Sequence, residues 1–462
     1  MIQQKRSFLK NGDAGVYTAM TTSNRRQFIT GLAGCSFASS SLSAFAQAQT
    51  PGTPILTPPP QGYGVEAERL TKVVQRTFWD KGHAQYRAPV RSAETVDSDR
   101  DHNNAYVLWP TLLGFYALVE GEKANPGQYR AQMRAVFDGM EAYFDPAASA
   151  YNAWRQFPGN NDKYFDDNAW LTAALAEAFE VTREVVYQER AVEIGRNFLP
   201  LGWDKSGNPG GQRWGTDPTK PGTGDRNACS TVSLALAAIS LTRLGIDRAA
   251  TLAMCRAALN WTSTHLRDTD DLIQDGLHSP DWAIMTTKWT YNTGALIRAY
   301  VDLYRFTGDR TYLNEAKRLA KAATDRSKRL YDGLVQNPEH RFWYDSSFFV
   351  PHLAEGLLAL YRETRDETLR EEVRRNANYA YHYLRDPADG LYWRNWRLWR
   401  IGAPQLETWH KLTGQDHPLE PDDSERSKEA RFDKVAVADR PLVKTLLANA
   451  GMARLFWLLA QT

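Results

Sequence analysis

Residues 164–170 read Tyr-Phe-Asp-Asp-Asn-Ala-Trp, so that two adjacent carboxylates, Asp166 and Asp167, lie between aromatic side chains. Residues 171–179, which follow, read Leu-Thr-Ala-Ala-Leu-Ala-Glu-Ala-Phe. Small and apolar residues recur there every three to four positions, and that spacing is typical of an α-helix. The acidic pair is therefore predicted to lie at the start of a helix.

The same opening recurs along the chain, because five apolar helical runs begin with Asn followed by a small residue. These starts are Asn104-Ala105, Asn168-Ala169, Asn227-Ala228, Asn292-Thr293 and Asn449-Ala450. Only the second of them carries Asp-Asp in front. We interpret the five as helix starts gathered at one pole of a ring, where the acidic pair supplies the chemistry.

Helical periodicity extends over most of the chain, and no convincing set of alternating strand patterns accompanies it. Twelve amphipathic segments are predicted as helices: 66–79, 104–120, 128–144, 167–182, 187–199, 229–243, 247–266, 291–306, 311–328, 348–364, 367–385 and 441–461. Short connections between them predict antiparallel hairpins. A Thr-x4-Tyr-x3-Ala pattern marks two such connections, starting at Thr182 and Thr307, and Thr364 begins a looser copy.

Six helical hairpins predict an all-α fold, and the division of polarity within them favours a closed ring over an open superhelix. The first helix of each pair is apolar and rich in small residues, whereas the second carries the charge, as in 315–318 and 370–375. We therefore predict an (α/α)6 barrel, with the first helices lining the inside. Their N-termini would then meet at one rim, with their positive dipole ends.

Six longer loops lead into that rim, where binding residues usually lie. They are 81–103, 145–165, 200–227, 268–290, 329–347 and 386–440. The last loop carries Trp393, Trp396 and Trp399, which could equally line a sugar groove or cover the barrel. The charged stretch 404–440 is predicted to be a solvated insert.

The composition indicates which partners and cofactors to expect. The net charge of +2 argues against a nucleic-acid partner. Aromatic residues make up 12% of the 462 residues, with 15 Trp, which fits stacking on sugar rings. The His residues show no metal-ligand spacing, so neither a metal nor a cofactor is expected. Cys229 and Cys255 are predicted to be buried thiols and not a disulfide.

The N-terminus carries a predicted export signal. Residues 23–29 read Ser-Asn-Arg-Arg-Gln-Phe-Ile, a twin-arginine pattern, and cleavage is expected near residues 46–48. Cys35 lies in a lipoprotein-like box, which we consider the less favoured route. The predicted division is 1–48 signal, 49–64 Pro-rich linker and 65–462 catalytic domain. We expect a periplasmic or secreted monomer without a transmembrane segment.

Splitting a glycosidic bond requires two carboxyl groups, one to protonate the leaving oxygen and one to attack or activate water. Neighbouring side chains at a helix start place their carboxyls roughly 5–6 Å apart, near the ~5–5.5 Å of a retaining pair. Mutual repulsion raises one pKa, so that one group stays protonated. The alternative interpretation is helix capping, for which Asp is a preferred residue.

Further candidates flank other helix starts. Asp225 and Arg226 could contact sugar hydroxyls or form a cap and a surface pair. Asp345 could be a third acid, although capping is favoured. The run 209–211, Pro-Gly-Gly, is interpreted as a turn.

The sequence resembles glycoside hydrolase family 76, the endo-α-1,6-mannanases. The resemblance rests on residues 164–170, followed in order by 209–211, 226–228, 290–294 and 348–350. It implies an (α/α)6 barrel and a metal-free retaining mechanism in which Asp166 is the nucleophile and Asp167 the general acid/base. Substrate-binding residues are expected at Asn104, Trp170, Asn227, Trp289, Tyr291 and Asn292.

The chain departs from the family pattern in loops that are expected to contact the sugar, and this leaves the identity of the glycan open. Thr293 stands where the family often has Gln, and 212–214 reads Gln-Arg-Trp where a Trp pair is common. We expect a glycosidase acting on α-mannan or manno-oligosaccharides. Two alternatives stay open: another (α/α)6 sugar enzyme, such as an unsaturated-uronyl hydrolase or an epimerase, and a non-catalytic glycan-binding protein.

Overall fold

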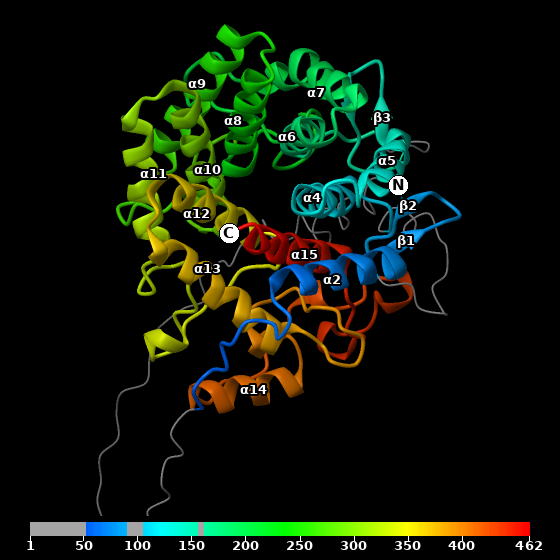
Figure 1. Cartoon of the computed structure of the whole chain (residues 1–462), viewed down its shortest axis with the longest axis vertical. Coiled ribbons are helices and arrows are strands. Elements are labelled where there is room, and N and C mark those ends of the chain that lie inside the picture. The colour runs from blue at the N-terminus through cyan, green and yellow to red at the C-terminus, as the bar shows by residue number, and fades with distance from the viewer. Residues whose placement is uncertain (1–51, 90–104, 156–160) are drawn as a thin grey trace, which may run out of the picture.

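The computed structural model describes residues 52–89, 105–155 and 161–462, and twelve of its helices form two concentric layers (Figure 1). The inner layer consists of α4 (Leu108–Ala124), α6 (Phe165–Thr182), α8 (Ala228–Arg243), α10 (Thr290–Thr307), α12 (Val350–Thr364) and α15 (Leu446–Ala460). The outer layer consists of α2 (Tyr63–Phe78), α5 (Arg130–Met140), α7 (Val185–Asn197), α9 (Arg248–His265), α11 (Arg310–Ala323) and α13 (Glu367–Tyr379). Each predicted helix of the twelve is present.

The inner layer is a closed ring. Successive inner helices contact each other from α4 through α15, and α15 contacts α4. The first and last helices of the barrel, α2 and α15, pack side by side and form the sixth pair of an outer and an inner helix (Figure 1). Gly294 and Gly356 permit a close crossing between α10 and α12, because a Cβ on either would collide with the backbone of the other helix. The fold is an (α/α)6 barrel, as predicted.

Three of the tight hairpin connections share one design, which explains the repeated threonines. In each, a threonine near the end of a helix accepts a hydrogen bond from the N–H two residues later, and the residue between has a positive φ. The turns are Thr182-Arg183-Glu184, Thr307-Gly308-Asp309 and Thr364-Arg365-Asp366, with N···Oγ1 distances of 3.2, 3.2 and 3.3 Å and φ of 64°, 74° and 58°.

The longer loops that enter the rim contain short antiparallel ladders. Their strands are β1 (Trp79–Asp80), β2 (Gln85–Tyr86), β3 (Phe144–Asp145), β4 (Ala150–Tyr151), β5 (Arg226–Asn227), β6 (Gly276–Leu277) and β7 (Ile284–Met285). They pair as β1-β2, β3-β4 and β5-β6-β7. A π-helix (Ala380–Leu384) continues directly from α13. Short 3-10 helices span Glu141–Tyr143, Leu199–Gly202, Pro338–His340, Leu398–Arg400, Asp423–Glu425, Ala430–Phe432 and Val437–Asp439. Backbone pairing in these loops fixes the rim on which the candidate site lies.

The stretch 404–440, predicted to be a solvated insert, is for the most part exposed or half-buried, but it is not wholly irregular. It contains a helix, α14 (Ala403–Thr413), whose Trp409 is buried. Trp393, Trp396 and Trp399 are also buried, and the Trp396 indole donates to Ser347 Oγ at 3.1 Å. These tryptophans therefore cover the barrel and do not line an open groove.

Residues 52–62 have almost no regular structure, and they lie against α13 and the π-helix that follows it. The N–H of Ile55 donates to the Tyr383 hydroxyl at 2.7 Å, and the Asn378 amide donates to the Leu56 carbonyl at 2.5 Å. Of the helices described, none has the length and apolar run needed to cross a membrane. The predicted signal, 1–48, lies outside the described residues.

Candidate active site

The acidic pair occupies the first turn of α6. Tyr164 is the N-cap residue, with an extended backbone, and its side chain makes no capping hydrogen bond. Phe165 begins the helix and is anchored on both sides: its N–H donates to the Trp214 carbonyl at 2.8 Å, and its ring stacks on Phe198 at 4.7 Å. Asp166 and Asp167 follow directly. Both half-buried carboxylates therefore lie at the positive end of an inner helix.

True capping aspartates in this chain look different. Asp309 and Asp366 are the N-cap residues of α11 and α13, and each accepts a hydrogen bond from the N–H two residues later, at 2.9 and 3.1 Å. Asp166 instead accepts a hydrogen bond from the indole Nε1 of Trp214 on Oδ2 at 3.2 Å. Its Oδ1 is buried and meets no N–H or O–H donor among the described residues. Asp166 is thus not held as a cap.

The electrostatic surroundings give the two carboxyls different pKa values. Burial raises the pKa of Asp166 to about 6, while the Cys229 thiol, the Asp167 N–H and the Trp214 indole each lower it. Burial also raises the pKa of Asp167 well above its usual range, and repulsion from Asp166 adds to this. No donor among the described residues offsets that shift. Asp166 is therefore the member of the pair that ionises first.

Aromatic rings flank the pair. Trp214 lies over Tyr164 with ring centroids 4.7 Å apart, and Trp154 packs edge-on against Tyr164 at 6.3 Å. Trp214 follows the Pro-Gly-Gly turn, in which Gly210 and Gly211 have positive φ. The sequence resemblance pointed to tryptophan after this turn, but only the structure brings its indole to Asp166.

A second acidic group, which the sequence analysis did not single out, lies before α10. Asp275 is buried, and the Tyr291 hydroxyl donates to it at 3.4 Å. Burial raises its pKa to about 7, the neighbouring side chains of Trp289, Tyr291 and Asn292 lower it, and Asp345 raises it. Its only sequence signal is an acid in a long loop entering the rim. Asp275 gathers three predicted substrate-binding residues around one carboxyl.

Asp345 holds a helix start, but that of α10 and not that of α12, the inner helix that it precedes in the sequence. Its Oδ2 accepts hydrogen bonds from the N–H and the hydroxyl of Thr290, at 2.7 and 2.9 Å, at the start of α10. Burial raises its pKa to about 6. Asp225 accepts from the Ser279 N–H at 2.9 Å, so it ties two rim loops together.

The recurring asparagines divide into two kinds. The side-chain amides of Asn168 and Asn449 bind loop backbone, with Oδ1 accepting from the N–H of Tyr151 and Tyr392 at 2.8 Å. These two are structural. Asn227 and Asn292 are also buried, yet the Oδ1 of each has no partner in the part of the chain that the structure describes. Each therefore keeps one buried acceptor atom that no described residue uses. Asn104 lies outside the described residues.

Trp170 lies one helical turn below the acidic pair, on the same helix. It is buried, with its ring 4.3 Å from that of His352 and 6.5 Å from that of Trp109. His352 accepts a hydrogen bond from Arg454 on Nδ1 at 3.2 Å, and burial holds its pKa well below its usual range. Trp170 thus packs inside the ring beneath the carboxylates.

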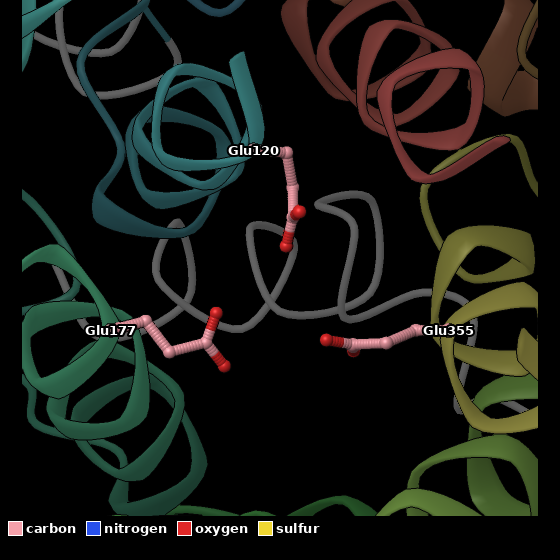
Figure 2. Close-up of side chains that lie close together, drawn as sticks. All are labelled: Glu120, Glu177 and Glu355. Carbon is pink, nitrogen blue, oxygen red and sulfur yellow. The ribbon is translucent and has the colours of Figure 1, made fainter. Parts of the chain in front are cut away.

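Three more carboxylates converge within the ring. Glu120, Glu177 and Glu355 project from α4, α6 and α12 toward one another, with carboxylate oxygens within 4.8 Å (Figure 2). Glu120 and Glu177 lie toward the C-terminal ends of α4 and α6, and Glu355 lies in the second turn of α12. Lys123 bridges Glu120 and Glu177 at 2.9 and 2.6 Å. Arg298 and Arg454 both bind Glu355. Three cations therefore match three anions, and the charge that a divalent metal would balance is already balanced.

Comparison with known proteins places the chain. The model of glycosyl hydrolase family 76 matches residues 66–410. The chain is similar to the meiotically up-regulated gene 191 protein of Schizosaccharomyces pombe, with 28% identity over 420 residues, 86% of this chain and 91% of the relative.

Solved structures share the fold. A family 76 mannosidase of Bacteroides thetaiotaomicron superposes with a TM-score of 0.66 at 18% identity, covering 86% of this chain and 98% of that one. An inactive variant of an α-1,6-mannanase of Salegentibacter sp., in complex with α-1,6-mannotriose, superposes with a TM-score of 0.63 at 18% identity, covering 86% and 99%. With the family model matching most of its length, the chain belongs to glycosyl hydrolase family 76.

Proposed function

We propose that this protein is a retaining glycoside hydrolase that cleaves α-1,6-mannosidic linkages in α-mannan through Asp166 and Asp167. The family membership supports a glycosidase. One observation carries the choice of residues: the two carboxyls share the first turn of α6, but only Asp166 receives side-chain donors. Asp166 is thereby suited to be an anion, and Asp167 to keep its proton.

The reaction would follow from that difference. Asp167 protonates the glycosidic oxygen while Asp166 Oδ1 or Oδ2 attacks the anomeric carbon, so the C–O bond breaks and a covalent glycosyl ester forms. Asp167, now ionised, removes a proton from water, which attacks the same carbon and releases Asp166. Two inversions give net retention. The aromatic and apolar surroundings keep bulk water away from the ester.

Support for a mannan substrate comes from relatives and from the wall of the site. The Salegentibacter relative is an α-1,6-mannanase, and its inactive variant carries asparagine in place of two adjacent aspartates. In this chain, Trp214 and Tyr164 offer ring faces, and Asn227, Asn292 and Asp275 offer polar atoms for sugar hydroxyls. The site thus combines one stacking surface with several buried hydrogen-bonding groups.

The test is sugar release from linear α-1,6-mannan by the purified protein, beside Asp166→Asn, Asp167→Asn and the capping control Asp366→Asn. We expect the control to keep its activity, and the two site variants, folded by circular dichroism, to lose most of theirs. Proton NMR of the first product should give the α-anomer. Cleavage of a different glycan through the same pair would correct the substrate. Binding of mannan without cleavage by the wild type would instead favour a glycan-binding protein.

We also propose export by the twin-arginine route, on the pattern at residues 23–29. Replacing Arg25 and Arg26 with lysine should retain the precursor in the cytoplasm, and sequencing the exported N-terminus gives the cleavage site. An exported chain that begins at Cys35 and carries lipid would favour the lipoprotein route. Light scattering tests the proposed monomer.

A further inference from the structure

Residues 52–57, which we call the strap, fall in the stretch predicted to be a Pro-rich linker, yet they lie in a groove between α14 and α13 with its π-helix (Figure 1). The strap has no helix or strand of its own, so its backbone groups must find partners elsewhere. On the α14 side of the groove, the N–H of Gly52 donates to the Lys411 carbonyl at 3.0 Å.

The other side of the groove binds the strap backbone through three side chains. Asn378 of α13 donates to the Leu56 carbonyl at 2.5 Å, and Tyr383 of the π-helix accepts from the Ile55 N–H at 2.7 Å. His382 Nε2 lies 2.9 Å from the carbonyl oxygen of the residue that follows Leu56. Six residues of chain therefore connect α14 to an outer helix of the barrel.

The side chain of Pro54 fills an aromatic pocket within the groove. Pro54 is buried, although the residues on either side of it are exposed. The rings that line the pocket with it are those of Phe342, Trp343, Tyr379, Trp396 and Trp409. The space left among them is about 20 Å³, which is too small for a sugar. Aromatic grooves are the surfaces that bind proline-rich segments, so the pocket fits the proline ring that it holds.

Helix α14 has little other contact with the barrel helices. Among the described elements it packs mainly on the 3-10 helix Leu398–Arg400. Trp409 is its one buried residue, and the ring of Trp409 lies in the Pro54 pocket. Beyond the end of the helix, Gln415 donates to the Leu334 carbonyl at 2.8 Å. The strap thus contacts α14 at the position where its apolar anchoring is concentrated.

We propose that the strap is an intramolecular ligand of this groove, and that Pro54 locks α14 onto the barrel. Prolines at positions 51, 58, 59 and 60 restrict the backbone on both sides of Pro54, so docking costs less conformational entropy than it would for a flexible segment. The strap is also joined directly to α2, so its effective concentration at the groove is high. Its role is to hold the cover of the barrel in place, and it requires no particular substrate.

Hydrogen exchange of the purified protein, read by mass spectrometry, tests the lock. Pro54→Ala removes the ring from the pocket. Pro58→Ala is the matched control, because Pro58 is exposed and its replacement frees the backbone to a similar extent. We expect the amides of α14 to exchange about 10-fold faster in Pro54→Ala and at the wild-type rate in Pro58→Ala, with those of α11 unchanged in both. Unchanged α14 exchange in Pro54→Ala, or an equal rise in Pro58→Ala, would overturn the proposal.

A double-mutant cycle tests whether Pro54 acts through the pocket. Trp409→Ala removes the α14 wall of the pocket, so α14 should exchange faster in this variant already. Adding Pro54→Ala to it should then raise the α14 exchange rate by less than about twofold, because the two side chains share one contact. If the two changes instead multiply, the proline acts elsewhere and the proposed lock is wrong.

Discussion

The indole Nε1 of Trp214 donates a hydrogen bond to Asp166 Oδ2 at 3.2 Å, while Asp167, the next residue, receives no comparable donor from the described chain. Two carboxyls that are adjacent in sequence thus have different chemistry. The ring of Trp214 also lies on Tyr164, so one side chain both supports the acid and forms part of the wall.

Trp214→Phe should keep the ring and remove the N–H. Because a hydrogen bond to a charged group contributes about 1.5–3 kcal/mol, we expect kcat/KM on α-1,6-mannan to fall by about 10- to 100-fold. Trp399→Phe is the matched control, since its indole also donates to an aspartate, Asp332, at 3.2 Å. A loss of activity in the control of similar size would mean that the effect is general destabilisation.

The roles of the two acids can be separated by chemical rescue. With an aryl α-mannoside whose leaving group needs no protonation, Asp167→Ala should still form the glycosyl ester but hydrolyse it slowly. Added azide should then restore turnover and give the α-mannosyl azide. Asp166→Ala, which lacks the nucleophile, should give no α-azide. Product stereochemistry by NMR decides the assignment, and the opposite pattern would exchange the two roles.

The pH dependence should be bell-shaped. Asp166 must be ionised, so kcat/KM should rise as pH passes about 6, the value to which burial raises its pKa. Asp167 must be protonated, so the rate should fall at higher pH, where its raised pKa is passed. In Trp214→Phe the rising limb should move to higher pH, because the indole lowers the pKa of Asp166. Initial rates between pH 4 and 9 measure both limbs.

Features with local periodicity could be predicted from the sequence. The twelve barrel helices, their pairing and the ring follow from apolar spacing and from threonine-marked turns, and the structure explains the threonines through their N–H contacts. The motif at residues 164–170 led to the correct family. The two buried thiols were also predicted correctly, since Cys229 and Cys255 are both buried and neither forms a disulfide.

Contacts that depend on tertiary placement could not be predicted. Asp275 lies in an aperiodic loop, and only the barrel brings it to Tyr291. The five asparagine starts look alike in sequence, yet the loop opposite each one decides whether its amide binds backbone, as in Asn168, or keeps a free oxygen, as in Asn227. Helix α14 was not predicted because it contains Pro404 and charged residues and has a single buried side chain, Trp409, so it shows no apolar periodicity.

Asp275→Asn should be less active than wild type but more stable at alkaline pH. The folded pKa of Asp275 is raised to about 7, above its ordinary 3.8, so the folded state binds more protons than the unfolded state between these values. The free energy of unfolding therefore falls as pH rises through this window, by about 4 kcal/mol, and stays lower above it. In Asp275→Asn this loss of unfolding free energy with rising pH should be absent, because the amide does not ionise.

We accordingly expect Asp275→Asn to be more stable than wild type at pH 8, to differ little at pH 4, and to cleave mannan more slowly. Urea unfolding at both pH values measures the first two effects. Equal stability of the two proteins at pH 8 would contradict a buried ionised Asp275.

The last prediction concerns the charges within the ring. Glu355 is buried and binds Arg298 and Arg454, the latter at 2.8 Å. Glu355→Gln removes one anion from a balanced set of three, so a buried guanidinium is left without its partner, and we expect a loss of about 3–5 kcal/mol in the free energy of unfolding. Glu407→Gln, in the exposed pair with Lys411 at 2.7 Å, should change nothing measurable. Since Lys123 and the two arginines already neutralise the glutamates, neither Ca²⁺ nor a chelator should shift the wild-type melting temperature. A clear rise with Ca²⁺ that Glu355→Gln abolishes would instead identify the three glutamates as a cation site.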